Sequence, residues 1–122
     1  MKTLGLIEVI LYVQDMDAQV RFYRDRLGLN VSYPQELSDY SQEFWVTLET
    51  GACTLALHAG GKHRLGEDTP KIVLGVEEIE TARQELLEGG VKIGEIRQAA
   101  PGVLLCDGRD PEGNPFSIEM RT

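Results

Sequence analysis

The chain has 122 residues, 42% of them hydrophobic and 26% charged, which suits one globular domain with a buried core. Its net charge of −8 argues against nucleic acid as a partner, because phosphate binding needs a clustered basic surface. The apolar stretch at residues 4–13 contains Glu8 and is too short for a membrane span. We therefore expect no membrane partner and a cytoplasmic location. Cys53 and Cys106 lack C-x-x-C spacing and are expected to be reduced core residues.

The first half of the chain predicts a strand, a helix and three further strands. Residues 7–13 alternate and are rich in β-branched side chains, as a strand requires. Asp15 then offers a helix N-cap, and an apolar stripe at helical spacing continues to Leu27 before Gly28 ends the helix. Short strands follow at residues 29–33, 44–48 and 53–58, with Gly51 in the last hairpin.

The second half repeats this order after a glycine-rich, charged linker at about residues 60–70. A strand is predicted at 71–76, a helix at 77–88, and strands at 91–96, 102–106 and 116–120. Equivalent residues keep a nearly constant separation, since Val13 and Val76 are 63 apart and Gly51 and Gly113 are 62 apart. The pattern predicts one domain, 1–122, made of two βαβββ modules at about 5–59 and 71–121.

A module of this kind covers only one face of its sheet with its helix. The other face must line a cavity, meet the second module, or meet another chain. We therefore predict an α+β fold in which two tandem βαβββ modules form a cupped, open barrel-like mixed sheet with the helices outside. The polar interior of the cup is the expected location of a functional site.

Two segments carry motifs of a known family. The run VQDMDAQVRFYRDRLGL has an aspartate that starts a helix and a Leu-Gly pair that ends it, and DGRDPEGNPF contains a DPxGN hairpin. Together with the internal repeat, they resemble the vicinal oxygen chelate superfamily of glyoxalases, bleomycin-resistance proteins and extradiol dioxygenases over nearly the whole chain. The resemblance implies a homodimer and, in the enzymes, a divalent metal held by four cup-facing side chains, two per module.

The four metal-ligand positions implied by the resemblance are Glu8, Ala56, Lys71 and Ser117. Ala56 has no donor atom, and serine at 117 replaces the usual glutamate. Lys71 would repel a divalent ion about 4 Å away by roughly 8 kcal/mol at an effective dielectric constant of 20. An alternative metal site made of Glu8, His58 and Glu119 meets the same repulsion. We therefore predict no metal and no other cofactor, and the alternative is a divalent-metal enzyme whose ligand positions differ from these four.

Strand alternation extends the set of residues expected to face the cup. On the strands that hold the four positions above, one parity is fully apolar and is expected to pack under a helix. The other parity gives the candidate site residues, which are Glu8, Tyr12, His58, Lys71, Ser117 and Glu119. Trp45 is added to one side of the cup, with its neighbour Phe44 as the alternative.

Glu8 and His58 are candidate proton-transfer residues, because a positioned carboxylate or imidazole can act as a general acid or base. Tyr12, Trp45, Lys71, Ser117 and Glu119 are candidate ligand-binding residues. For Glu8 and Lys71, the alternative is an ion pair that satisfies two buried charges. For His58 and Glu119, the alternative is a solvated position at the rim.

The sequence leaves three functions open. We favour a metal-free, small-molecule-binding homodimer like the antibiotic-sequestering members of the family. Its acidic charge would suit a cationic drug such as bleomycin, although one tryptophan offers little stacking surface. The second function is a lyase, isomerase or dioxygenase that uses Glu8 or His58 for proton transfer, so enzyme activity is left open. The third is a non-catalytic dimeric module whose cup is filled by its own side chains.

Overall fold

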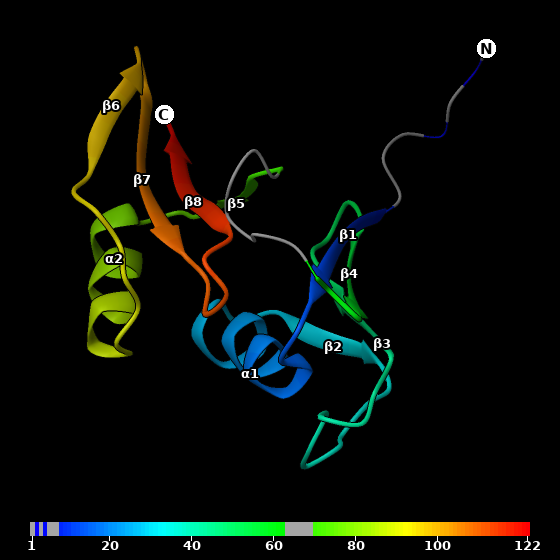
Figure 1. Cartoon of the computed structure of the whole chain (residues 1–122). Coiled ribbons are helices and arrows are strands. Elements are labelled where there is room, and N and C mark those ends of the chain that lie inside the picture. The colour runs from blue at the N-terminus through cyan, green and yellow to red at the C-terminus, as the bar shows by residue number, and fades with distance from the viewer. Residues whose placement is uncertain (1, 3, 5–7, 63–69) are drawn as a thin grey trace. The chain divides into compact units, whose positions relative to one another are not determined.

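The computed structural model describes residues 2, 4, 8–62 and 70–122. The chain divides into two compact units, Met1–His63 and Arg64–Thr122, and the boundary falls inside the predicted linker. Each unit contains one βαβββ module, so the α+β class and the duplication are confirmed (Figure 1). Residue 7 of the first predicted strand and residues 63–69 of the predicted linker lie outside the described residues.

The first unit consists of β1 (Glu8–Val13), α1 (Met16–Arg21) continued by the π-helical turn η1 (Phe22–Arg26), β2 (Asn30–Tyr33), β3 (Trp45–Glu49) and β4 (Thr54–Ala59). Its strand order is β1-β4-β3-β2, with β1 parallel to β4 and the other pairs antiparallel. The helix starts as predicted, because Asp15 Oδ1 accepts a hydrogen bond of 3.0 Å from the Ala18 N–H.

The core of the first unit lies between α1 and one face of this sheet. The apolar parity of the strands supplies the buried residues Leu11, Val13, Val46, Leu48, Leu55 and Leu57. Met16, Val20 and Tyr23 are the buried residues that the helix contributes, and α1 contacts β4. The predicted assignment of the apolar parity to the helix side is therefore confirmed for this unit.

The second unit repeats the arrangement with β5 (Ile72–Gly75), α2 (Ile79–Glu88), β6 (Arg97–Ala100), β7 (Val103–Arg109) and β8 (Pro115–Arg121). Its strand order, β5-β8-β7-β6, matches the first unit, and β5 is parallel to β8. Phe116, Ile118 and Cys106 form the buried parity of the sheet, and α2 packs on β7 and β8 (Figure 1). No helix in the described part of the chain is long and apolar enough to cross a membrane.

The strand predicted at residues 91–96 is wrong, because β6 begins only at Arg97. Ile93 forms one isolated bridge to Gly108, and the Gly94 N–H donates to the Asp107 carbonyl at 2.8 Å. The carbonyl of Gly94 is taken by Arg83 Nε of α2 at 2.7 Å, so the segment does not continue as a ladder there. In contrast, β7 extends three residues beyond its predicted end, to Arg109, and this brings Asp107 into the sheet.

Both cysteines are free, as predicted. Cys106 is fully buried, and burial raises the pKa of its thiol, which disfavours the reactive thiolate. Cys53 is only partly buried. Cys106 therefore behaves as a small core residue of the second unit.

Candidate functional site

The open face of the first sheet, meaning the face turned away from α1, gathers four of the predicted site residues. In the parallel pair, Tyr12 of β1 lies opposite His58 of β4, and in the antiparallel pair His58 lies opposite Trp45 of β3. Paired residues share a face, so the side of Trp45 is now decided. Glu8 lies on the same face, opposite Thr54.

Four rings form an exposed cluster at one end of this face. The His58 ring centroid lies 4.8 Å from Tyr12, 4.6 Å from Phe44 and 5.8 Å from Trp45. The planes of Phe44 and Trp45 are inclined to the imidazole by 64° and 88°, the edge-to-face geometry that aromatic rings prefer. Phe44 and Tyr12 remain 65% and 49% exposed. We call Tyr12, Phe44, Trp45 and His58 the ring cluster.

The tautomer of His58 follows from one contact. Its Nδ1 lies 2.6 Å from the carbonyl oxygen of Ala59. A carbonyl only accepts hydrogen bonds, so Nδ1 carries the proton, and Nε2 of the neutral imidazole keeps its lone pair. No described residue hydrogen-bonds to Nε2. This atom can therefore accept a hydrogen bond or a proton from a bound molecule.

The open face of the second sheet is organised around Asp107, a residue not considered in the sequence analysis. Its Oδ1 accepts hydrogen bonds from Ser117 Oγ at 2.5 Å and from Lys71 Nζ at 3.0 Å. Its Oδ2 accepts from Arg97 Nη2 at 3.0 Å. We call these four residues the Asp107 network. It joins Lys71 and Ser117, the two positions of the second unit where the resemblance implies metal ligands, to a carboxylate.

The Asp107 network strongly stabilises the ionised carboxylate. The hydroxyl of Ser117 is the main cause, and together with Lys71 and Arg97 it outweighs partial burial and lowers the pKa of Asp107 from 3.8 to about 2. Two cations meet one carboxylate here, so the network has an excess positive charge in an otherwise acidic chain.

This pKa predicts a specific acid dependence of stability. Because the folded-state pKa is depressed, Asp107 adds stability above pH 3.8, and this stability is lost as pH falls towards about 2. The side chain is 44% exposed, so solvent screening reduces the contribution to roughly 1 kcal/mol. We expect Asp107→Asn to flatten the plot of unfolding free energy against pH between pH 4 and pH 2. Urea unfolding at several pH values measures this, and an unchanged slope would contradict it.

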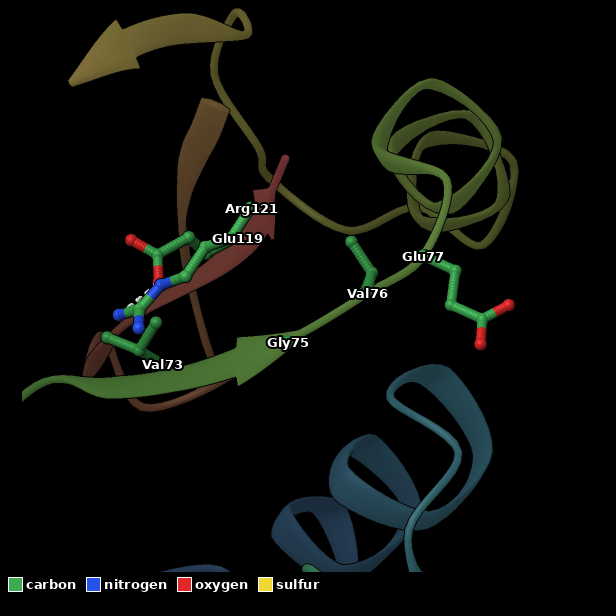
Figure 2. A pocket seen from close by; sticks show the side chains of 6 residues that line it. All are labelled: Val73, Gly75, Val76, Glu77, Glu119 and Arg121. Carbon is green, nitrogen blue, oxygen red and sulfur yellow. Dashed lines mark hydrogen bonds and ion pairs between the residues drawn. The ribbon is translucent and has the colours of Figure 1, made fainter. Parts of the chain in front are cut away.

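A pocket of about 580 Å³ opens on the same unit, as Figure 2 shows, and its lining residues are Val73, Gly75, Val76, Glu77, Glu119 and Arg121. Arg121 Nη2 pairs with Glu119 Oε2 at 2.9 Å on one side of the pocket. Gly75 and Glu119 lie opposite each other, as Tyr12 and His58 do in the first unit. The pocket therefore occupies the position in the second module that the ring cluster occupies in the first.

The predicted site residues thus fall into two groups. Glu8, Tyr12, Trp45 and His58 share the open face of the first unit, while Lys71, Ser117 and Glu119 share that of the second. The ion pair predicted between Glu8 and Lys71 would join the two units and stays a prediction. Within the second unit, the partner of Lys71 is Asp107. Asp107 could have been found from hairpin symmetry, because it and Ser117 lie five residues either side of Glu112.

The residues at the family's metal-ligand positions do not fit a divalent metal. Ala56 has no donor atom, and Lys71 and Ser117 both bind Asp107. Across residues 2, 4, 8–62 and 70–122, no group of three or more His, Cys, Asp or Glu side chains is arranged to hold a metal ion. Lys71 therefore places a positive charge at a position where the resemblance implies a metal ligand.

The profile of the Glyoxalase/Bleomycin resistance protein/Dioxygenase superfamily matches residues 5–118 of this chain. The chain belongs to this superfamily. The match covers both modules and confirms the resemblance carried by the first helix and the DPxGN hairpin. No curated protein has significant sequence similarity to the chain.

Solved structures share the fold over at least 98% of the chain. A glyoxalase family protein from Bacillus anthracis is 16% identical, with a TM-score of 0.78, and the match covers 100% of this chain and 98% of that one. An antibiotic binding protein from Streptomyces sp. CB03234 is also 16% identical, with a TM-score of 0.78 and coverage of 100% and 99%. Lactoylglutathione lyase from Agrobacterium tumefaciens is 19% identical, with a TM-score of 0.73 and coverage of 98% and 96%.

Proposed function

We propose that this superfamily member is a metal-free protein that binds a small molecule on the open faces of its two sheets. The observation that carries this proposal is the Asp107 network, in which Lys71 and Ser117 both bind a carboxylate instead of facing a metal. An ammonium group at a former ligand position neutralises negative charge without a metal ion. In this proposal the chain keeps the fold of the superfamily, but its residues at the implied metal-ligand positions do not bind a metal.

Two surfaces support ligand binding in particular. The ring cluster offers exposed aromatic area beside Nε2 of His58, which has no hydrogen-bond partner among the described residues. The pocket at Gly75 offers a hollow with an ion pair at its edge. In this proposal Tyr12 and Trp45 contact the ligand in the first unit, and Lys71, Ser117 and Glu119 do so in the second. The antibiotic binding protein with the same fold supports a small-molecule ligand.

A homodimer and a cytoplasmic location belong to the same proposal. Each sheet ends in two edge strands, which are β1 and β2 in the first unit and β5 and β6 in the second. Unpaired strand edges favour association with another chain unless they are covered. The acidic net charge agrees with a freely dissolved protein.

One observation favours an enzyme as the alternative. The tautomer of His58 leaves Nε2 as a proton acceptor, and the rings of Tyr12, Phe44 and Trp45 lie 4.8, 4.6 and 5.8 Å from the centroid of the imidazole. A general base needs this combination of a free lone pair and reach to a substrate. A metal-independent lyase or isomerase could therefore use His58, with Glu8 on the same face as a second proton-transfer group.

Metal analysis tests the proposal first. We expect protein purified without chelators to contain no near-stoichiometric zinc, nickel, manganese or iron, because Lys71 opposes a divalent charge. Adding these ions should leave the melting temperature unchanged, while a screen of small carboxylates and aromatic amines should contain compounds that raise it. A bound metal whose removal lowers the melting temperature would overturn the metal-free assignment. A screen in which no compound raises it would overturn the binding function.

A further inference from the structure

We propose that the ring cluster of the first unit is a stacking subsite for a flat aromatic cation. The inference rests on the binding function proposed above and assigns the ligand's chemical class. It comes from three features of one sheet face, which are exposed rings, a hydrogen-bond acceptor that no described residue binds, and two carboxylates at one end.

The rings are arranged to receive another ring. Phe44 and Trp45 meet the imidazole of His58 edge to face, so their flat faces do not stack on that ring. Exposed single apolar residues are common, but rings gathered at one place in an exposed patch usually mark an interaction site. Phe44 is held there because the Ala59 N–H donates to its carbonyl at 2.9 Å, which extends the ladder between β3 and β4.

The hydrogen-bond acceptor of His58 restricts the class of ligand further. Nε2 of His58 has a lone pair, because Nδ1 donates to the Ala59 carbonyl. A buried acceptor that loses water without a new partner costs free energy. A ring that covers the cluster should therefore carry an N–H or O–H donor on its edge, directed at Nε2.

The other end of the same face sets the sign of the ligand's charge. Thr54 of β4 lies between Glu8 of β1 and Glu49 of β3, which are its partners in the two ladders. Both carboxylates share the face of the ring cluster. The strand residues on this face are Glu8, Ile10, Tyr12, Asn30, Tyr33, Trp45, Thr47, Glu49, Thr54, Ala56 and His58, and none of them is a lysine or arginine. Two carboxylates on a face whose described strand residues include no cation attract a positively charged ligand.

The second unit is an internal comparison for this inference. Its positions equivalent to Tyr12, Trp45 and His58 are Gly75, Leu105 and Glu119, by the pairing of β5, β7 and β8. None of these three residues has a ring. The two units share the same sheet, but only the first carries rings at these positions, so the stacking subsite belongs to the first unit.

Fluorescence of the full-length chain tests the proposal, because Trp45 is its only tryptophan. The probe is proflavine, a flat tricyclic cation with amino groups on its edge. We expect proflavine to quench Trp45 saturably and to show raised fluorescence anisotropy when bound. The flat anion 2-naphthoate and the non-aromatic cation cyclohexylammonium should bind much more weakly, because each lacks one of the two required properties.

Variants assign binding to the cluster. Phe44→Ala removes an exposed ring and should weaken proflavine binding roughly three- to tenfold. His58→Phe keeps a ring but removes Nε2, and should weaken binding by about the same factor. Leu87→Ala is the control, because Leu87 is a 39% exposed apolar residue on α2 of the second unit, outside this sheet, and its loss should leave the affinity unchanged. Circular dichroism checks that each variant is folded.

The outcomes separate this inference from the proposed function. Absence of proflavine binding, or binding that persists unchanged in Phe44→Ala and His58→Phe, would overturn the aromatic-cation subsite. If small carboxylates still raise the melting temperature in that case, the protein remains a ligand-binding protein with a different ligand class. If no compound of any class raises it, the binding function itself fails.

Discussion

Replacement of Gly108 by alanine is expected to lower the free energy of unfolding by roughly 3 kcal/mol, the upper part of the usual range for overpacking. An added Cβ would lie 2.7 Å from Cζ of Phe116 and 2.8 Å from the Lys92 carbonyl oxygen. Phe116 is fully buried, and Lys92 contributes rigid backbone, so neither neighbour moves cheaply. Gly108 is thus required because a neighbouring ring and backbone fill the space of its missing side chain.

Gly75→Ala is the matched control for this substitution. Gly75 also lies in a strand of the second sheet, but an added Cβ meets no atom within 4 Å. We expect its stability to stay within about 0.5 kcal/mol of the parent chain, because surface substitutions rarely change stability by more. Urea unfolding of both variants measures the difference, and equal losses would contradict the packing argument.

The sequence alone was sufficient to predict which side chains of a strand are buried and which lie on the open face, where the residue types alternate along the strand. The alternation in β1 and β4 correctly separated Leu11 and Leu57, which are buried against the helix, from Tyr12 and His58 on the open face. This separation needs only the two-residue period of a strand and one buried face. Because the second unit repeats the first, the same alternation predicted which of its strand residues are buried.

The sequence was insufficient where the answer depends on which strands pair and in what register. The side of Trp45 became clear only from its pairing with His58. Asp107 was overlooked because its strand was predicted to stop at residue 106, and its three partners come from separate strands or strand ends. From the sequence alone, a glycine such as Gly108 would be expected in a turn. In the structure it lies within β7.

Asp110→Ala is expected to cost roughly 3 kcal/mol of stability, because it removes the acceptor at the centre of the DPxGN turn. Asp110 is 5% exposed and Asn114 is 2% exposed. Oδ1 of Asp110 accepts from the N–H groups of Glu112 and Asn114, both at 2.9 Å, and Oδ2 accepts from Asn114 Nδ2 at 3.0 Å. Alanine would leave these donors without an acceptor in a largely buried turn, where each loss costs about 1–3 kcal/mol.

This turn also sets the register that places Asp107 opposite Ser117, so its loss should weaken the Asp107 network as well. Asp39→Ala is the control, because Asp39 makes similar bonds to the N–H and hydroxyl of Ser41 at 2.8 and 2.9 Å but is exposed, so water can replace them. Urea unfolding should show a large loss for Asp110→Ala and an unchanged midpoint for Asp39→Ala. Similar midpoints for both variants would mean that the motif is not a structural requirement of the β7–β8 hairpin. A large loss would show that the DPxGN motif sets the register of the β7–β8 hairpin, and would leave ligand binding to the side chains that this register places on the open face of the second sheet.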